Sequence, residues 1–198
     1  MCKKMERFET VIIGTGPAGL GAAFTLSSED PGRSILVIDR ESVSTGGLRN
    51  DCKMNFTYPI GFPLEYWTQE EAESCLREVI AELSPSIMEK NKLSVYQKRA
   101  EKLGVTLLDI KQTHLGTDGG QELIRDLMGR LAERGVAVSL GEELLSVDQE
   151  RKVVVTSKRE IGYGDLVAAP GRKGFRFLQN LMDSIGIPYI DHIVDIGM

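Results

Sequence analysis

A glycine-rich turn between two apolar segments is the feature that most constrains the fold of this chain. The β-branched run Phe8–Ile13 leads directly into Gly14–Gly19, with the sequence GTGPAG. Residues Pro17–Leu26 are predicted to form a helix, because proline is tolerated in a first helical turn. Ser34–Asp39 is predicted as a second buried strand. Two continuously apolar strands joined by a helix predict a parallel β-α-β unit that is covered on both faces.

The glycine spacing matches the G-x-G-x-x-G fingerprint of dinucleotide-binding folds, in its expected place between a strand and a helix. Gly14 allows the tight turn, Gly16 lets a pyrophosphate approach the backbone, and Gly19 lets the helix pack close to the strands. The helix N-terminus adds N–H groups and a partial positive charge. The predicted pyrophosphate-binding residues are Gly14, Gly16, Pro17, Ala18 and Gly19.

An acidic residue at the end of the second strand indicates which dinucleotide is bound. Asp39 lies twenty positions after Gly19, where a carboxylate accepts hydrogen bonds from a ribose diol. The same carboxylate would repel a 2′-phosphate, so NADP is disfavoured at this site and FAD or NAD remains. Arg40 follows directly, and its position is consistent both with an adenosine contact and with a solvated surface charge.

The rest of the chain is predicted to continue as a mixed α/β protein. Residues 40–68 have the composition of a loop. Helices are predicted over Glu70–Leu83, over Pro85–Leu103 with Ser84 as the N-cap, after the turn Gly116–Gly120 as far as Gly135, and over Phe175–Ile185. Strands are predicted over Val105–Ile110, Val136–Leu140, Glu143–Val147, Lys152–Ser157, Ile161–Ala169 and the terminal run Ile193–Met198.

Composition excludes several classes of protein. The chain has 198 residues, with 24 Lys and Arg against 29 Asp and Glu, and the net charge of −5 argues against a nucleic-acid partner. Three cysteines without C-x-x-C spacing and only two histidines argue against a disulfide scaffold or a metal centre. No apolar run is long enough for a signal peptide or a membrane span, so we expect no membrane partner and a cytoplasmic location.

Later motifs resemble those of glutathione-reductase-like flavoproteins. A glycine pair, Gly46 and Gly47, follows Asp39 by seven positions, and Leu166–Gly171 resembles the second flavin motif with proline in place of its threonine. The segments Gly46–Asn55, Tyr58–Phe62, His114–Asp118 and Asp195–Gly197 resemble an uncharacterised group of FAD-dependent dehydrogenases over about residues 8–198.

This resemblance implies a Rossmann-like FAD/NAD(P)-binding domain over residues 1–174, with a parallel sheet, a β-meander and a loop and helical excursion at 50–104. Residues 175–198 would begin a truncated second, substrate domain. FAD is the implied cofactor, with NAD(P)H as a candidate electron donor. Besides the fingerprint, Asp39 and Arg40, the implied cofactor-binding residues are Gly46, Gly47 and Leu48 along the cofactor, Leu144 at the adenine and Gly171 near the second motif.

Catalytic residues are not assigned by the sequence. Cys52 lacks the second cysteine that a dithiol mechanism requires, and Cys75 lies on the apolar face of a predicted helix. Arg49, Asn50 and Lys53 could stabilise a reduced flavin, and His114 could exchange a proton. Solvated loop charges and a structural histidine are the favoured explanations. The substrate, the electron acceptor and the oligomeric state are left open.

Four functional hypotheses remain. The first is an FAD-dependent oxidoreductase, in which the protein binds, orients and electrostatically tunes the flavin. The second is an NAD-binding protein without flavin. The third is a catalytically incomplete fragment that holds the ADP half of FAD, because the chain stops within an apolar run. The fourth is a tRNA-modifying flavoprotein, which the acidic charge disfavours.

Overall fold

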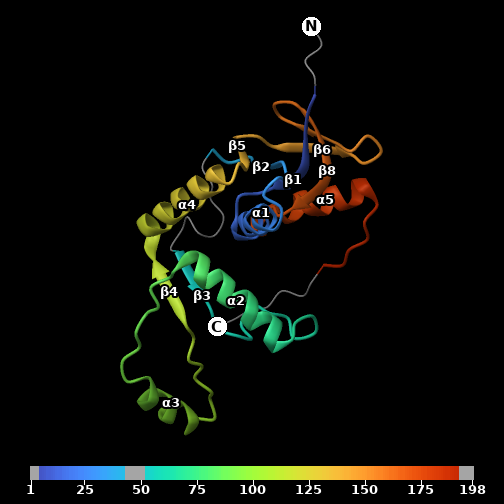
Figure 1. Cartoon of the computed structure of the whole chain (residues 1–198). Helices are drawn as coiled ribbons and strands as arrows, with labels where there is room; N and C mark the ends of the chain where they lie inside the picture. The colour runs from blue at the N-terminus through green and yellow to red at the C-terminus, as the bar shows by residue number, and fades with distance from the viewer. Residues whose placement is uncertain (1–4, 43–51, 192–198) are drawn as a thin grey trace. The chain divides into compact units, whose positions relative to one another are not determined.

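The protein consists of two compact units in a computed structural model that describes residues 5–42 and 52–191 (Figure 1). The first unit combines Met1–Arg49 with Gln121–Met198, and the second is Asn50–Gly120. The predicted excursion at 50–104 therefore corresponds to a unit that extends further, to residue 120.

A six-stranded sheet forms the frame of the first unit. Its strands are β1 (Glu6–Ile13), β2 (Ile35–Asp39), β5 (Ala137–Leu140), β6 (Leu144–Asp148), β7 (Val153–Thr156) and β8 (Glu160–Ala168). They lie in the order β5-β2-β1-β8-β7-β6. β1 pairs in parallel with β2 and β8, β2 pairs in parallel with β5, and β6, β7 and β8 form an antiparallel meander. The predicted Rossmann-like α/β fold with a parallel sheet and a β-meander is confirmed.

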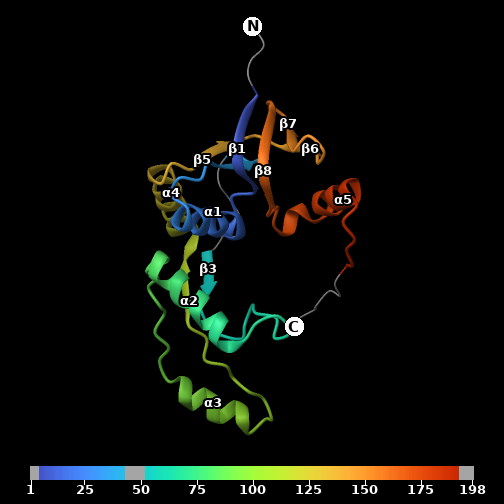
Figure 2. The ribbon, with the colours of Figure 1, turned by 45° about the vertical axis from the view of Figure 1, so that its right-hand side comes forward.

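Helices cover both faces of this sheet. α1 (Pro17–Glu29) connects β1 to β2, and α5 (Phe175–Ile185) follows a short 3-10 turn, η1 (Arg172–Gly174). Leu181 and Phe177 of α5 pack with Val11 and Ile13 of β1, whereas α1 lies on the side of Ile12. Figure 2 shows α1 and α5 on opposite sides of β1 and β8. Such two-sided burial explains why β1 and β2 are continuously apolar in sequence.

The carboxyl-terminal part of α4 (Gly116–Glu133) adds a second helix to the α1 side. The guanidinium of Arg134 lies 4.8 Å from the centroid of the Phe24 ring and donates a hydrogen bond of 2.7 Å to Ser28 Oγ. Gly135, with φ +77°, ends the helix as predicted.

The prediction that residues 175–198 begin a second domain stays a prediction. Within this range, α5 packs onto the core of the first unit.

The second unit holds a two-stranded antiparallel ribbon and two helices. The strands are β3 (Cys52–Asn55) and β4 (Gln112–Leu115), and the helices are α2 (Gln69–Leu83) and α3 (Leu93–Glu101). α2 begins with a capping box, in which Thr68 Oγ1 accepts a hydrogen bond from the Glu71 N–H and the Glu71 carboxylate accepts one from the Thr68 N–H. Within the part of the chain that the structure describes, no helix has the length and apolar character needed to cross a membrane.

We expect Thr68→Ala to loosen the start of α2, because an N-cap hydroxyl contributes about 1 kcal/mol. Amide hydrogen exchange in the first turn of α2 should become about fivefold faster, while exchange in β1 stays unchanged. Thr68→Ser, which keeps the hydroxyl, should exchange at the wild-type rate. Equal acceleration in both variants would contradict a role for the cap.

Four sequence predictions for residues 50–120 are wrong. Ser84 is not the N-cap of a helix over Pro85–Leu103; it is the left-handed C-cap of α2, with φ +44°, and its N–H donates to the Ile80 carbonyl at 2.8 Å. The proline that follows cannot continue α2, since it lacks an N–H group. The later helix is therefore limited to α3, which starts after Lys92 at φ +61°.

The predicted strand Val105–Ile110 is also absent, and a strand forms instead at β4 within the more polar run that follows. β4 pairs with β3, which lies in the region predicted as loop. A strand forms only where it can pair with another strand. Pairing with β3 therefore determines where the strand forms, and the largely apolar run Val105–Leu108 remains exposed and outside any strand.

The start of α4 also differs from the prediction, since the helix begins at Gly116 rather than after Gly120. Burial of Leu127 and Leu131 on the same helix outweighs the low helix propensity of its glycines.

Candidate functional site

The turn after β1 requires glycine at its first position. Gly14 has φ +107°, and its N–H donates to the Ile38 carbonyl at 2.7 Å. A Cβ atom at Gly14 would lie 2.2 Å from the carbonyl oxygen of Ala169, just after β8. The tight turn was predicted; the close approach of the chain after β8 is the additional reason that only glycine fits there.

The third glycine of the fingerprint allows α1 to approach the turn. A Cβ atom at Gly19 would lie 1.9 Å from the Gly14 carbonyl oxygen and 3.5 Å from Cγ2 of Ile12. This confirms by geometry the close helix–strand packing that the spacing indicated.

The N-terminus of α1 is built to receive an anion. Gly16 is the N-cap, in extended conformation, with no side-chain cap, and Pro17 occupies the first turn, which contains no acidic residue. The first N–H groups of a helix have no partner within the helix, and the helix dipole places partial positive charge there. Ala18 and Gly19 therefore lie in the first turn of α1, where an anion would be favoured.

The carboxylate of Asp39 is fixed beside this turn. Its Oδ2 accepts hydrogen bonds from the Thr15 N–H at 2.8 Å and from the Thr15 hydroxyl at 2.6 Å, and its Oδ1 accepts one from the Glu41 N–H at 2.9 Å. Asp39 is partly buried and Thr15 is 1% exposed. The side chain predicted to bind a ribose is thus held at the carboxyl end of β2, next to the predicted pyrophosphate site.

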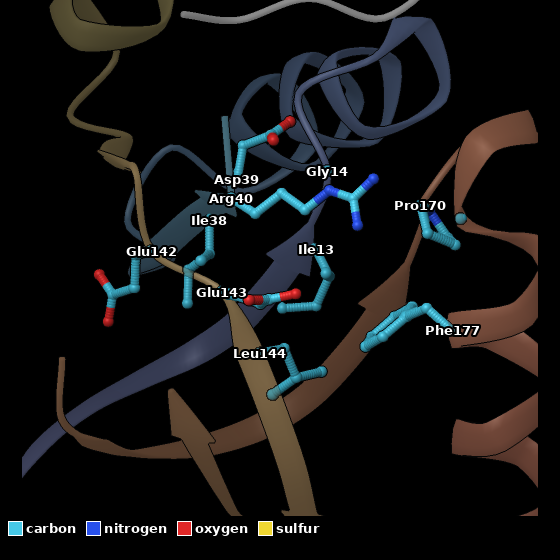
Figure 3. Close-up of a pocket in the computed structure, with 11 residues that line it drawn as sticks. Ile13, Gly14, Ile38, Asp39, Arg40, Glu142, Glu143, Leu144, Pro170 and Phe177 are labelled. Carbon is cyan, nitrogen blue, oxygen red and sulfur yellow. The ribbon is translucent and has the colours of Figure 1, made fainter. Parts of the chain in front are cut away.

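One pocket of the first unit collects predicted residues from several parts of the chain. Figure 3 shows them around the carboxyl ends of β1 and β2 and the start of β6. Of the predicted residues, Gly14, Asp39, Arg40 and Leu144 line it. The other lining residues are Ile13, Ile38, Glu142, Glu143, Pro170, Gly174 and Phe177. Most of these were not singled out by the sequence, because they come together only through the fold.

The other predicted residues are not among those that line this pocket. Gly16, Pro17, Ala18 and Gly19 belong to the turn and the start of α1 beside it, but they do not line it. Gly46, Gly47 and Leu48 lie outside the described residues. Gly171, with φ +67°, precedes η1 and is not among the lining residues, although its neighbour Pro170 is. The second motif therefore reaches the pocket through Pro170, the residue that stands in place of the usual threonine.

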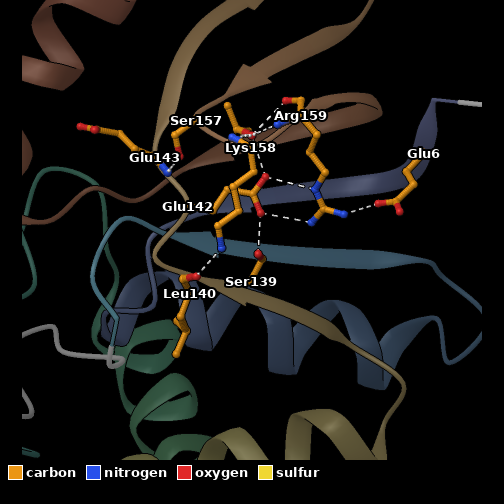
Figure 4. Close-up of polar contacts among 9 residues, drawn as sticks. Glu6, Ser139, Leu140, Glu142, Glu143, Ser157, Lys158 and Arg159 are labelled. Atoms are coloured by element: carbon orange, nitrogen blue, oxygen red, sulfur yellow. Dashed lines mark hydrogen bonds and ion pairs between the residues drawn. The ribbon is translucent and has the colours of Figure 1, made fainter. Parts of the chain in front are cut away.

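An ion pair between a buried carboxylate and a partly exposed guanidinium supports the edge of the pocket. Glu142 is 0% exposed, and its carboxylate accepts two hydrogen bonds from the Arg159 guanidinium, both at 3.1 Å (Figure 4). It also accepts hydrogen bonds from the hydroxyls of Ser139 and of Thr156, the latter at 2.6 Å. Arg159 pairs in addition with the exposed carboxylate of Glu6.

Burial alone would raise the pKa of Glu142. The hydrogen bonds from Arg159, Ser139 and Thr156, together with the positive charge of Arg159, outweigh this effect and hold the pKa below its ordinary value. The Glu142 N–H donates to the Asp39 carbonyl at 2.9 Å. The pair therefore fixes the segment that places both Asp39 and Leu144.

Comparison with known proteins identifies the family. The model of the family described as pyridine nucleotide-disulphide oxidoreductase matches residues 8–181. The chain belongs to this family. No curated protein sequence matches it.

Solved structures share the fold of this family member at low sequence identity. Glycine oxidase from Bacillus cereus has a TM-score of 0.60 and 14% identity, over 91% of this chain and 58% of its own. L-proline dehydrogenase from P. horikoshii has a TM-score of 0.59 and 15% identity, over 92% of this chain and 57% of its own. The chain thus spans little more than half the length of these proteins. The predicted resemblance to glutathione-reductase-like FAD/NAD(P)-binding proteins is confirmed at the level of the family.

The family is named for disulphide chemistry, but the described cysteines give no sign of a dithiol. Cys52 is a buried thiol in β3 and Cys75 a partly buried thiol in α2. Lys53 and His114 lie opposite each other in the β3–β4 ribbon, so His114 belongs to a strand. Arg49 and Asn50 lie outside the described residues. Within residues 5–42 and 52–191, no group of three or more His, Cys, Asp or Glu residues could hold a metal ion.

Proposed function

We propose that the first unit is the FAD-binding domain of an FAD-dependent oxidoreductase and that its pocket holds the adenosine half of FAD. One observation carries the proposal. Gly14, Asp39 and Leu144, which were predicted to contact the pyrophosphate, the ribose and the adenine, line a single pocket. That pocket lies at the carboxyl ends of parallel strands, and the helices that follow β1 and β8, α1 and α5, lie on opposite faces of the sheet. Open α/β sheets bind their ligands at such a point.

The chain's own residues fit the parts of the cofactor. The start of α1 would hold the pyrophosphate through backbone N–H groups, since the N–H groups of Gly14 and Thr15 donate to the Ile38 carbonyl and to the Asp39 carboxylate. Asp39 would accept hydrogen bonds from the ribose. Leu144 and Phe177 provide apolar surface for the adenine, and both belong to the cluster of packed hydrophobic residues in this unit. When bound, FAD would supply the acceptor for a hydride or an electron pair.

The family and the oxidase and dehydrogenase folds favour FAD over NAD at this site. We propose a small-molecule substrate and NAD(P)H as an electron donor, with neither nucleic acid nor membrane as a partner. We also propose a cytoplasmic location. The net charge of −5 supports the absence of a nucleic-acid partner.

Titration with FAD, followed by flavin fluorescence and calorimetry, tests this function. Wild type should bind FAD, and Asp39→Asn should weaken binding about tenfold, because a hydrogen bond to a charged group contributes about 1.5–3 kcal/mol. Asp126→Asn is a matched control, since Asp126 is an exposed carboxylate on α4 that does not line the pocket. Wild-type protein that takes up NAD but neither FAD nor ADP would overturn the proposal.

A further inference from the structure

We propose that Thr15, the first variable position of the glycine fingerprint, is a positioning residue that fixes the Asp39 carboxylate for ribose recognition. This inference rests on the proposed function. It concerns the hydroxyl of Thr15 rather than the backbone of the turn, and the fingerprint itself does not specify a residue type at this position.

The contact between the two side chains has the geometry of a strong hydrogen bond. Thr15 Oγ1 donates to Asp39 Oδ2 at 2.6 Å, within the range of about 2.5–2.7 Å typical of hydroxyl-to-carboxylate bonds. The same oxygen accepts the Thr15 N–H at 2.8 Å. One residue therefore holds one carboxylate oxygen through two donors.

Burial makes this arrangement persistent. Thr15 is 1% exposed, so its hydroxyl cannot exchange the carboxylate for bulk water without moving the turn. Threonine is also restricted at χ1 by its branched Cβ. The donor therefore has a fixed direction, and the acceptor is fixed with it.

The fixed carboxylate retains capacity for a ligand. From the residues that the structure describes, its two oxygens accept three hydrogen bonds, from the Thr15 N–H, the Thr15 hydroxyl and the Glu41 N–H. An ionised carboxylate offers about four acceptor positions. Asp39 also lines the pocket. A ribose hydroxyl can therefore bind without displacing Thr15, and the carboxylate does not have to be ordered when the nucleotide binds.

Three matched variants test the role of the hydroxyl. Thr15→Val replaces the hydroxyl by a methyl group, and Thr15→Ser keeps it. Thr25→Val makes the same change as Thr15→Val at an exposed position on α1. Two probes, ADP and 2′,3′-dideoxy-ADP, are titrated by calorimetry into each protein. Circular dichroism checks that each variant is folded, and Thr15→Ala replaces Thr15→Val if the valine variant does not fold.

Wild type should prefer ADP to its dideoxy analogue about tenfold, and Thr15→Val should lose most of this preference by weakening ADP binding about tenfold. Affinity for the dideoxy analogue should change less than about threefold, because that probe has no hydroxyl for Asp39 to bind. Thr15→Ser and Thr25→Val should keep the wild-type preference.

Equal weakening of both probes in Thr15→Val would show a structural role only and overturn this inference, while leaving the proposed function intact. Loss of the preference in Thr15→Ser would overturn it as well. A wild-type protein that binds neither probe would overturn both this inference and the proposed function.

Discussion

Gly19→Ala is expected to lower the free energy of unfolding by about 3 kcal/mol, at the upper end of the cost of overpacking. The added Cβ atom would lie 1.9 Å from the Gly14 carbonyl oxygen. That oxygen belongs to the backbone of a turn that is itself held by the hydrogen bond from Gly14 N–H to the Ile38 carbonyl, so it cannot move aside as a flexible side chain would. Urea unfolding followed by circular dichroism measures the change.

Gly21→Ala provides a control two residues along the same helix. Nothing lies within 4 Å of a Cβ atom at Gly21, and alanine is favoured over glycine in a helix by about 0.8–1 kcal/mol. The same substitution should therefore destabilise the protein at one position and stabilise it at the other. Equal effects at Gly19 and Gly21 would refute the close packing of α1 against the turn.

FAD binding should also be affected by Gly19→Ala and unaffected by Gly21→Ala. Gly19→Ala displaces the start of α1 from the turn, so the helix N-terminus no longer faces the pyrophosphate and FAD affinity should fall at least about tenfold. Gly21→Ala should bind FAD as wild type does. An unchanged affinity in a folded Gly19→Ala variant would contradict the assignment of the pyrophosphate to the start of α1.

The first 40 residues could be predicted well because their determinants are local. A turn with two glycines, a proline at the start of a helix and two short β-branched runs each limit the backbone within a few residues, and β1, α1 and β2 follow. The same order of elements singled out Asp39, and the family resemblance singled out Leu144; both line one pocket. The second unit could not be predicted in this way. A serine is compatible with either end of a helix, so the residue type of Ser84 did not decide between an N-cap and a C-cap. The sequence of β4 is polar, and its pairing with β3, which is distant in sequence, cannot be inferred from it.

The supporting residues of the site were also not predictable, for a related reason. Glu142 reads as an ordinary surface glutamate beside a turn, and only the fold brings it to Arg159 across the β6–β7 meander. Neither residue carries a motif. A buried carboxylate that pairs with a guanidinium 17 positions later leaves no periodic signal in one sequence.

The second large effect is expected at this pair. Arg159→Met should lower the free energy of unfolding by about 3–5 kcal/mol, because it leaves the Glu142 carboxylate buried without its countercharge. The double variant Glu142→Leu/Arg159→Met should be more stable than Arg159→Met, because it removes the unpaired charge together with its partner. Urea unfolding at pH 7 compares the two, with Arg151→Met as control for a guanidinium on exposed ion pairs. A double variant less stable than Arg159→Met would contradict the explanation.

The pH dependence gives the same pair an independent test. Because the folded-state pKa of Glu142 is lowered, its contribution to stability is complete above the unfolded-state pKa of about 4.3 and is lost as the pH falls through the folded-state value. The protein should therefore lose stability below about pH 5, with a smaller loss in Glu142→Gln, whose side chain does not titrate. In Arg159→Met the sign reverses, since a buried carboxylate without its countercharge is more stable protonated, and acidification from pH 7 to pH 5 should then recover part of the lost stability. Parallel pH profiles for wild type and Arg159→Met would show that Glu142 is not stabilised by Arg159.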